Sequence, residues 1–255
     1  MNEKRLSGWD DFLDEISKNH NAATSEFMYR GQSSESWSLQ STLERKTEYK
    51  EYLSELYLNE CLRISTQIES VTGKKWVLPT FEELQKEIKT INDDPPWVRL
   101  PMLDFLVYLR HYGYPSPLLD WTESPFIAAY FAYIGSEKEN PAVYIFRKRN
   151  SRSQLDHEPI VTIQDRFLST DKRHVLQKTR FTIATRYDEE SRKIFFSEHA
   201  LALENIGELT KLILPVKDRK PALAYLSDHC LNHFSLFGSE DSLIQSIAFQ
   251  IFDLK

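Results

Sequence analysis

The stretch from Leu118 to Gly135 constrains the fold of this chain more than any other part of its sequence. It opens with Leu118-Leu-Asp-Trp-Thr122, a short and mainly apolar run that is typical of a buried strand. Ser124 and Pro125 then favour a helix start, with serine at the N-cap and proline at the first helical position. The helix predicted over 125–134 is apolar on nearly every side, and such a helix usually lies at the centre of a fold. We therefore expect a core built round this strand and helix.

Hydrophobic patterns elsewhere predict both kinds of secondary structure along the whole chain. The spacing of apolar residues predicts helices over 9–17, 49–70, 81–91, 101–112, 221–233 and 242–252, and strands over 26–30, 142–146, 181–185, 193–196 and 209–214. We interpret residues 1–255 as a single α+β domain with a helical insertion at about 46–100. The expected sheet is mixed, mainly antiparallel and flanked by helices.

The composition narrows the class of protein. A formal net charge of −6 argues against broad, non-specific binding of nucleic acid, which needs a cationic surface, although it is compatible with a local basic site. The presence of only two cysteines favours a reducing, cytoplasmic setting. No apolar run reaches the length of a membrane span, so we expect no membrane partner.

Polar side chains within the apolar strand are the first candidates for a site. Side chains alternate along a strand, so Asp120 and Thr122 share one face, while Leu119 and Trp121 take the other. A carboxylate in such a strand destabilises the fold unless it is paired with a cation or exposed to water. The helix start at Ser124 offers unpaired N–H groups that can bind an anion. The alternative is structural, with Asp120 capping the turn and Ser124 serving only as an N-cap.

The second candidate is the run Tyr29-Arg30-Gly31-Gln32, at the end of a predicted strand. Arginine is the favoured residue for bidentate recognition of carboxylate or phosphate, and Gly31 removes side-chain bulk beside Arg30. The alternative is a structural salt bridge from Arg30, with Asp120 as a possible partner. The two interpretations are compatible with each other.

The third candidate is His111, in the last turn of the predicted helix 101–112. The helix dipole favours a charged imidazole there, and the side chain can act as an acid, a base or a hydrogen-bond donor. The alternative is a histidine that only ends its helix. His229 and His233 have a spacing that can bind zinc, but no second pair of ligands matches them, so we predict no metal site.

Together these motifs resemble the FRG domain family, which is named for an aromatic-Arg-Gly motif near its start. The resemblance covers most of the chain and is most specific in its centre. It rests on Tyr29-Arg-Gly-Gln32, Trp37-Ser-Leu39 with Arg45, His111-Tyr-Gly-Tyr-Pro115 and Leu118 to Ala132, and more loosely on Gln177, Phe181-Thr182, Leu212-Ile-Leu-Pro215 and Leu236-Phe237.

Two positions depart from the family pattern. Ser116-Pro117 stands where the family usually has Thr-Arg, and the loss of that arginine would weaken an anion contact. Thr179 stands where the family often has a glycine near Gln177.

The resemblance implies a function as well as a fold. Some members of the family look like parts of bacterial anti-phage or toxin systems. The arrangement is also similar, more distantly, to ADP-ribosyltransferases, which would imply a split sheet, NAD as the cofactor and glycosyl transfer without a metal. The catalytic candidates are then Arg30, His111, Asp120 and Glu208, with Glu204 and Glu198 as rivals of Glu208 near the last strand. The residues expected to bind NAD are Tyr29, Gly31, Gln32, Tyr112, Trp121, Thr122, Ser124 and Gln177.

Two other functions are compatible with the same residues. The pocket could belong to a binding module that senses a nucleotide or another phosphorylated small molecule without turnover. A nucleic-acid-directed effector would need paired carboxylates at metal-binding spacing, and the sequence shows no convincing cluster of this kind. The acceptor of a transfer reaction, protein or nucleic acid, is left open by the sequence.

Overall fold

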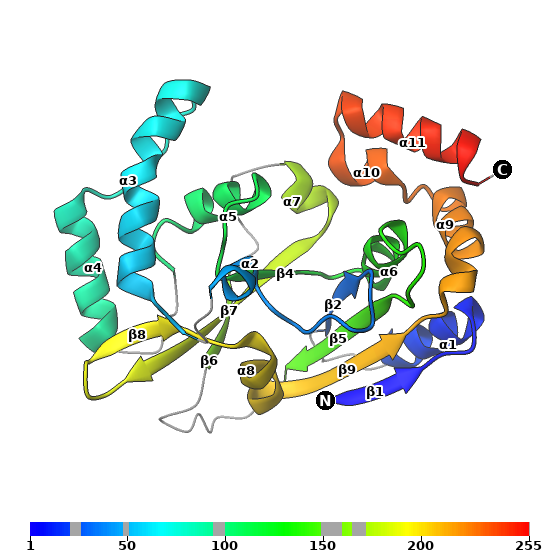
Figure 1. The fold of residues 1–255 in the computed structure, drawn as a ribbon, viewed down its shortest axis with the longest axis horizontal. Helices are drawn as coiled ribbons and strands as arrows, with labels where there is room; N and C mark the ends of the chain where they lie inside the picture. The colour runs from blue at the N-terminus through cyan, green and yellow to red at the C-terminus, as the bar shows by residue number, and fades with distance from the viewer. Residues whose placement is uncertain (21–26, 48–50, 94–99, 149–159, 165–171, 255) are drawn as a thin grey trace.

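A nine-stranded sheet forms the middle of the fold, in the order β1-β9-β5-β2-β4-β7-β8-β3, with β6 paired to β7 (Figure 1). The computed structural model describes residues 1–20, 27–47, 51–93, 100–148, 160–164 and 172–254. The strands are β1 (Asn2–Arg5), β2 (Phe27–Gln32), β3 (Tyr52–Leu53), β4 (Leu118–Thr122), β5 (Ala142–Lys148), β6 (Ile160–Gln164), β7 (Thr179–Asp188), β8 (Lys193–Phe196) and β9 (Gly207–Ile213).

The pairing of the strands confirms a mixed, mainly antiparallel sheet in an α+β fold. β1 runs parallel to β9, and the other described pairs are antiparallel. The two halves of the sheet, β1-β9-β5-β2 and β4-β7-β8-β3, meet where Tyr29 of β2 pairs with Thr122 of β4. This junction is a single register pair in the described strands, and Arg30 and Asp120 lie beside it.

Helices cover both halves of the sheet. α1, α6 and α9 pack on one face of the first half, α3, α4 and α5 pack on the second half, and α8 lies against the opposite face. Figure 1 shows α3 and α4 at one end of the molecule and α9 to α11 at the other. The helices are α1 (Trp9–His20), α2 (Thr42–Lys46), α3 (Ser54–Thr72), α4 (Phe81–Asp93), α5 (Leu103–His111), α6 (Pro125–Ile134), α7 (Lys172–Leu176), α8 (His199–Ile206), α9 (Arg219–Asp228), α10 (His233–Phe237) and α11 (Glu240–Phe252), with a 3₁₀ turn at Val216–Asp218.

Helix α6 is central, as its apolar composition predicts. Seven of its residues are buried, and it packs directly on β2. The close packing depends on Gly31, because a Cβ at this position would lie 1.9 Å from the carbonyl oxygen of Ala128. Any larger residue would push α6 away from the strand that carries Arg30.

Several predicted elements are confirmed, and three of them are confirmed to the residue. β4, α6 and β8 have the predicted bounds. Ser124 is the N-cap of α6, Pro125 is its first residue, and Gly135 is its C-cap. Gly113, just after α5, has the left-handed φ of 85° that a glycine after a helix end often adopts.

Other predicted elements need correction. β2 continues through Gly31 to Gln32, and the helix expected from 49 starts at Ser54, after the short strand β3. Residues 26, 49 and 50, at the starts of two predicted elements, lie outside the described residues. α5 starts at Leu103 because Met102 has a φ of 55°. The helix predicted over 221–233 is two helices, separated where Cys230 has a φ of 61°.

The sequence patterns missed β1, β3, β6, α2, α7 and α8. β1, for example, is exposed at all four of its residues and has no apolar pattern to detect. Among the described residues, no helix combines the length and the apolar character that a membrane span requires.

Candidate functional site

The site begins where β2 and β4 meet, because this junction brings Arg30 onto Asp120. Arg30 Nη1 donates a hydrogen bond to the backbone carbonyl of Asp120 at 2.8 Å and lies 3.1 Å from its Oδ2. The Arg30 side chain is 14% exposed, whereas the Asp120 side chain is 44% exposed. The predicted salt bridge between the two residues is therefore present, and its carboxylate is open to a ligand.

A second arginine shares the same carboxylate. Arg110, near the end of α5, pairs through Nη2 with Oδ1 of Asp120, and its Nη1 lies 3.4 Å from the hydroxyl of Thr42. The Arg110 side chain is 13% exposed. Asp120 thus bridges two nearly buried guanidinium groups from different elements.

A third arginine, Arg45 of α2, completes what we call the cationic cluster: Arg30, Arg45, Arg110 and Asp120. Burial lowers the pKa of Arg30 to about 10. Burial and the charges of Arg30 and Arg45 lower the pKa of Arg110 to about 9. Burial and the charge of Arg30 also lower the pKa of Arg45, against the attraction of Glu44. The positive charges of the three guanidinium groups therefore act on one another. Arg30 and Arg110 share the carboxylate of Asp120, whereas Arg45 is exposed and donates through Nη1 to the backbone carbonyl of Gln40 at 2.9 Å.

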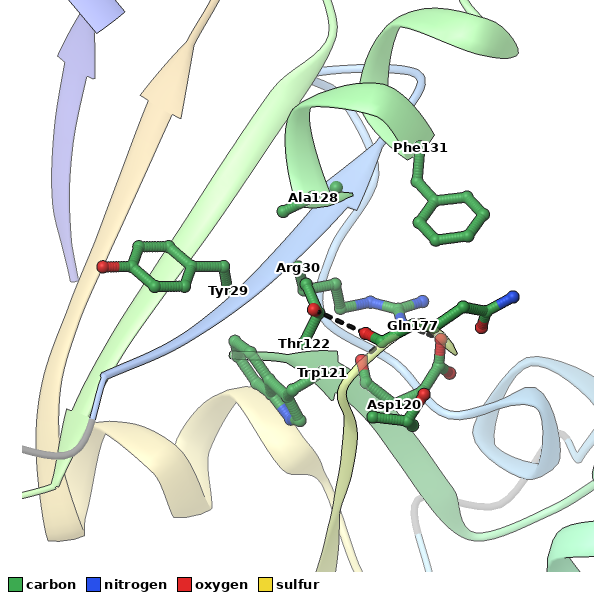
Figure 2. Close-up of a pocket in the computed structure, with 10 residues that line it drawn as sticks. Tyr29, Arg30, Asp120, Trp121, Thr122, Ala128, Phe131 and Gln177 are labelled. Carbon is green, nitrogen blue, oxygen red and sulfur yellow. Dashed lines mark hydrogen bonds and ion pairs between the residues drawn. The ribbon is translucent and has the colours of Figure 1, made fainter. Parts of the chain in front are cut away.

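The cluster borders two cavities. A small one, of about 50 Å³, is lined by residues of β2, β4, α6 and the start of β7, among them Arg30, Asp120, Thr122, Phe131 and Gln177 (Figure 2). A larger one, of about 490 Å³, is lined by Arg30, Gln32, Arg45 and the loop between β2 and α2, which includes Trp37. Arg30 and Gly31 line both, so the two cavities adjoin at this part of β2.

Unused hydrogen-bonding atoms also point to a ligand. Within the described part of the chain, Arg30 Nε and Gln32 Oε1 are buried without a hydrogen-bond partner. Buried polar atoms normally have a hydrogen-bond partner, so each of these atoms is available for a hydrogen bond with a bound ligand. Both belong to the Tyr29–Gln32 run that the sequence singles out.

Two further lining residues of the small cavity are Thr122 and Gln177, and Ser124 supports them from behind. The Thr122 hydroxyl donates to the carbonyl of Gln177 at 2.7 Å and accepts from the Ser124 N–H at 3.1 Å. Ser124 Oγ in turn accepts from the N–H of Ile127. These contacts confirm the N-cap role of Ser124. They also use N–H groups that were expected to bind an anion, so positive charge reaches the pocket chiefly through the arginines.

Tyr29 and Trp121 line the small cavity mainly through their strand positions. The ring of Tyr29 points away from Asp120 in Figure 2 and is 2% exposed. The indole N–H of Trp121 donates to the hydroxyl of Thr182 at 2.9 Å, inside the protein. Both residues therefore support the site from the core.

Glu208 does not meet Arg30, and the expectation that they share one pocket is corrected. Glu208 is in register with Arg147 of β5, which in turn pairs with Phe27 of β2. Phe27 and Arg30 are three residues apart in one strand, so their side chains lie on opposite faces. Glu208 is half exposed and lies 3.6 Å from Arg147. Its rival Glu204 lies 3.2 Å from the amino group of Met1.

Two other predicted residues lie outside both cavities. Tyr112 is 68% exposed and lines an apolar groove between α3 and α5. His111 is half-buried at the end of α5, and the lining residues described for the two cavities do not include it. Arg110, its neighbour, is the residue of this turn that reaches Asp120.

Fold and site together define an α+β protein with a cationic pocket at the junction of a divided sheet. The FRG domain family matches residues 25–141, a range that contains all four residues of the cationic cluster and helix α6. The match confirms, over this range, the resemblance to the FRG domain family that the sequence motifs indicate. No curated protein and no solved structure matches the chain.

Proposed function

We propose that the cationic cluster binds a nucleotide-like small molecule through its phosphate groups. The observation that carries this proposal is the imbalance of charge, since three guanidinium groups accompany Asp120, and Arg30 of this cluster lines two cavities. Arg30 and Arg110 are nearly buried, and burying like charges together is costly unless a counter-charge is present. Planar guanidinium groups match the geometry of phosphate oxygens, which makes phosphate the preferred counter-charge.

The shape of the pocket favours a ligand with groups on both sides of its phosphates. Because Arg30 borders both cavities, a diphosphate beside it would direct one end of the ligand toward each. The larger cavity has Trp37 on its wall, with 56% of that side chain exposed, and an exposed indole offers a surface on which a base can stack. NAD, with a central diphosphate, is the ligand of this kind that we propose as cofactor.

Isothermal titration calorimetry with ADP and NAD tests the binding proposal. The wild-type protein should bind at least one of them, and Arg30→Gln should weaken that binding strongly. Arg186→Gln, at an arginine remote from the pocket, is the matched control and should leave the affinity unchanged. No binding of either compound by the folded wild-type protein would refute the proposal.

Transfer of the ADP-ribosyl group of NAD is the second candidate function. The packing of an Arg-Gly strand against a polar strand that enters α6 supports it, since this is the arrangement that the distant resemblance implies. Asp120 is then the carboxylate nearest to the reacting sugar among the described lining residues of the small cavity. Release of nicotinamide from NAD by the pure protein, absent in Arg30→Gln, tests this. Binding without release would favour a sensing module.

We also propose the cellular setting that the family resemblance implies, a bacterial defence or toxin-type effector with a protein or nucleic-acid acceptor. Expression of the wild-type chain should then slow bacterial growth, while expression of the Arg30→Gln variant at the same level should not. Equal growth of both cultures would contradict the toxin role. The binding proposal would still be tested independently by calorimetry.

A further inference from the structure

A buried pair of side chains lies directly behind the cationic cluster. His199, the first residue of α8, is 1% exposed, and its Nδ1 lies 2.6 Å from Oε2 of Glu44 in α2. The backbone N–H of His199 also donates to Oε1 of Glu44 at 3.1 Å. The two residues are separated by 155 positions in the sequence. The pair thus joins the short helix α2 to an element of the opposite half of the chain.

The other side of the imidazole is also fixed. His199 Nε2 lies 3.3 Å from the backbone carbonyl of Thr182 in β7, an oxygen that can only accept. The hydroxyl of Thr182 accepts the indole N–H of Trp121 in β4. The ring of His199 is therefore clamped between α2 and the sheet, and both of its nitrogens have a defined partner.

The Glu44 carboxylate also accepts a hydrogen bond that caps α2. Its Oε2 accepts the N–H of Ser41 at 2.7 Å, which completes a capping box with the Ser41 hydroxyl. Although burial opposes ionisation, hydrogen bonds from His199 and Ser41 leave the pKa of Glu44 below its usual value. Among the described contacts of the His199 ring, Glu44 is the one charged group.

Helix α2 brings two contacts to the cationic cluster. Arg45, next to Glu44, lines the larger cavity, and Thr42 lies against Arg110. The helix has five residues, which is too short to be stable alone, so tertiary contacts must set its position. On one side it is held by Ser116, whose carbonyl accepts the N–H of Leu43. On the other side it is held by His199.

We propose that Glu44 and His199 are positioning residues for the cationic cluster, because their buried pair fixes α2 so that Arg45 faces the ligand. They touch no cavity that Arg30 lines, within the described lining residues. Their effect on binding passes through Arg45, and the ligand part of this inference rests on the proposed function.

The placement of Arg45 can be measured without a ligand. In nitrogen-15 NMR spectra of arginine side chains, Glu44→Gln and His199→Asn should each shift the Arg45 Nε–H signal. His233→Asn is the control, since His233 contacts the Tyr130 hydroxyl at 3.3 Å and lies on α10. An Arg45 signal that is unchanged in folded Glu44→Gln would overturn the proposal. Glu44→Gln changes one carboxylate oxygen to an amide and keeps this test available if His199→Asn does not fold.

A double-mutant cycle with ADP then separates positioning from a general loss of stability. Glu44→Gln should weaken ADP binding about tenfold in the wild-type background, and less than about twofold when Arg45 is already alanine. A weakening of equal size in both backgrounds would mean that Glu44 does not act through Arg45, and would overturn the proposal. If the wild-type protein binds no ADP, the proposed function fails, while the NMR measurement still decides the role of Glu44 and His199.

Discussion

Two arginine clusters in this protein have opposite ratios of charge. Arg186 of β7 donates to both oxygens of Glu51, at 2.5 and 2.7 Å, and to Asp188 at 3.2 Å. One guanidinium thus has two carboxylates, and their hydrogen bonds raise the pKa of Arg186. In the cationic cluster, three guanidinium groups accompany Asp120, and burial and mutual repulsion lower the pKa of Arg110.

The comparison separates a structural tie from a site. The Arg186 guanidinium is paired with two carboxylates of the protein and links β7 to the segment before α3, so it needs no further partner. Among the described residues, the cationic cluster has more guanidinium groups than carboxylates, and it lies beside cavities that can admit a ligand. Buried charge is tolerated where it serves binding, which is why we assign function to the second cluster and stability to the first.

Exchange of the key arginine in each cluster should produce the largest contrast. Arg30→Gln should weaken ADP binding about 50-fold, because two or more charge-assisted hydrogen bonds to phosphate are lost. Arg186→Gln should change the ADP affinity less than about twofold but lower the free energy of unfolding by about 1 kcal/mol. Calorimetry and urea unfolding of both variants measure this. A loss of binding in Arg186→Gln as large as in Arg30→Gln would erase the distinction.

Removal of the Asp120 carboxylate should increase the difference in charge between the cationic cluster and the Arg186 cluster. Asp120→Asn should tighten ADP binding about tenfold, since Asp120 competes with the ligand for Arg30 and Arg110. The same variant should melt at a lower temperature without ligand, because the guanidinium groups repel one another. Weaker ADP binding in Asp120→Asn would instead mean that Asp120 contacts the ligand itself, as a catalytic carboxylate would.

The Arg186 cluster should respond to acid. Hydrogen bonds from Ser191 and Arg186 lower the pKa of Asp188 from 3.8 to about 2. Because the folded pKa lies below the unfolded one, the contribution of Asp188 to stability is complete above about pH 4 and is lost as the pH falls toward 2. Wild type should therefore be more stable than Asp188→Asn at pH 6, with the difference shrinking at pH 2.5. A difference independent of pH would contradict the pairing.

The smallest expected effect on binding and turnover is at Glu208, whose side chain lies on the face of the sheet opposite Arg30. Glu208→Gln should leave ADP binding and any release of nicotinamide within about twofold of wild type, since its side chain faces Arg147 across the sheet from Arg30. A loss of turnover with unchanged ADP affinity would restore Glu208 as a catalytic residue and would require the sheet to rearrange.

The sequence predicted the centre of the fold well because its signals there are local. Ser124, Pro125 and Gly135 set the bounds of α6, and apolar runs on either side set β4 and β5. Arg30, Gly31, Asp120, Thr122 and Gln177, which the sequence motifs and the family resemblance single out, line one cavity.

The rest of the site depends on distances and rotations that no local pattern encodes. Whether Arg110 or His111 reaches Asp120 depends on how α5 is rotated against the sheet, and neighbouring helix residues point about 100° apart. The face taken by Glu208 depends on strand register, where a shift of one residue reverses every side chain. The contact of Glu44 with His199 crosses most of the chain. A closer reading of Ser41-Thr-Leu-Glu44 as a capping box would have found α2, and with it Arg45.

The most direct test of the central claim is the position of ADP in crystals of the protein. We predict density for its diphosphate within hydrogen-bond distance of Arg30 and Arg45, with the base beside Trp37. Crystals of Arg30→Gln soaked in the same way should show no such density. ADP bound elsewhere, for example in the apolar groove between α3 and α5, with the cationic cluster unchanged, would contradict the account.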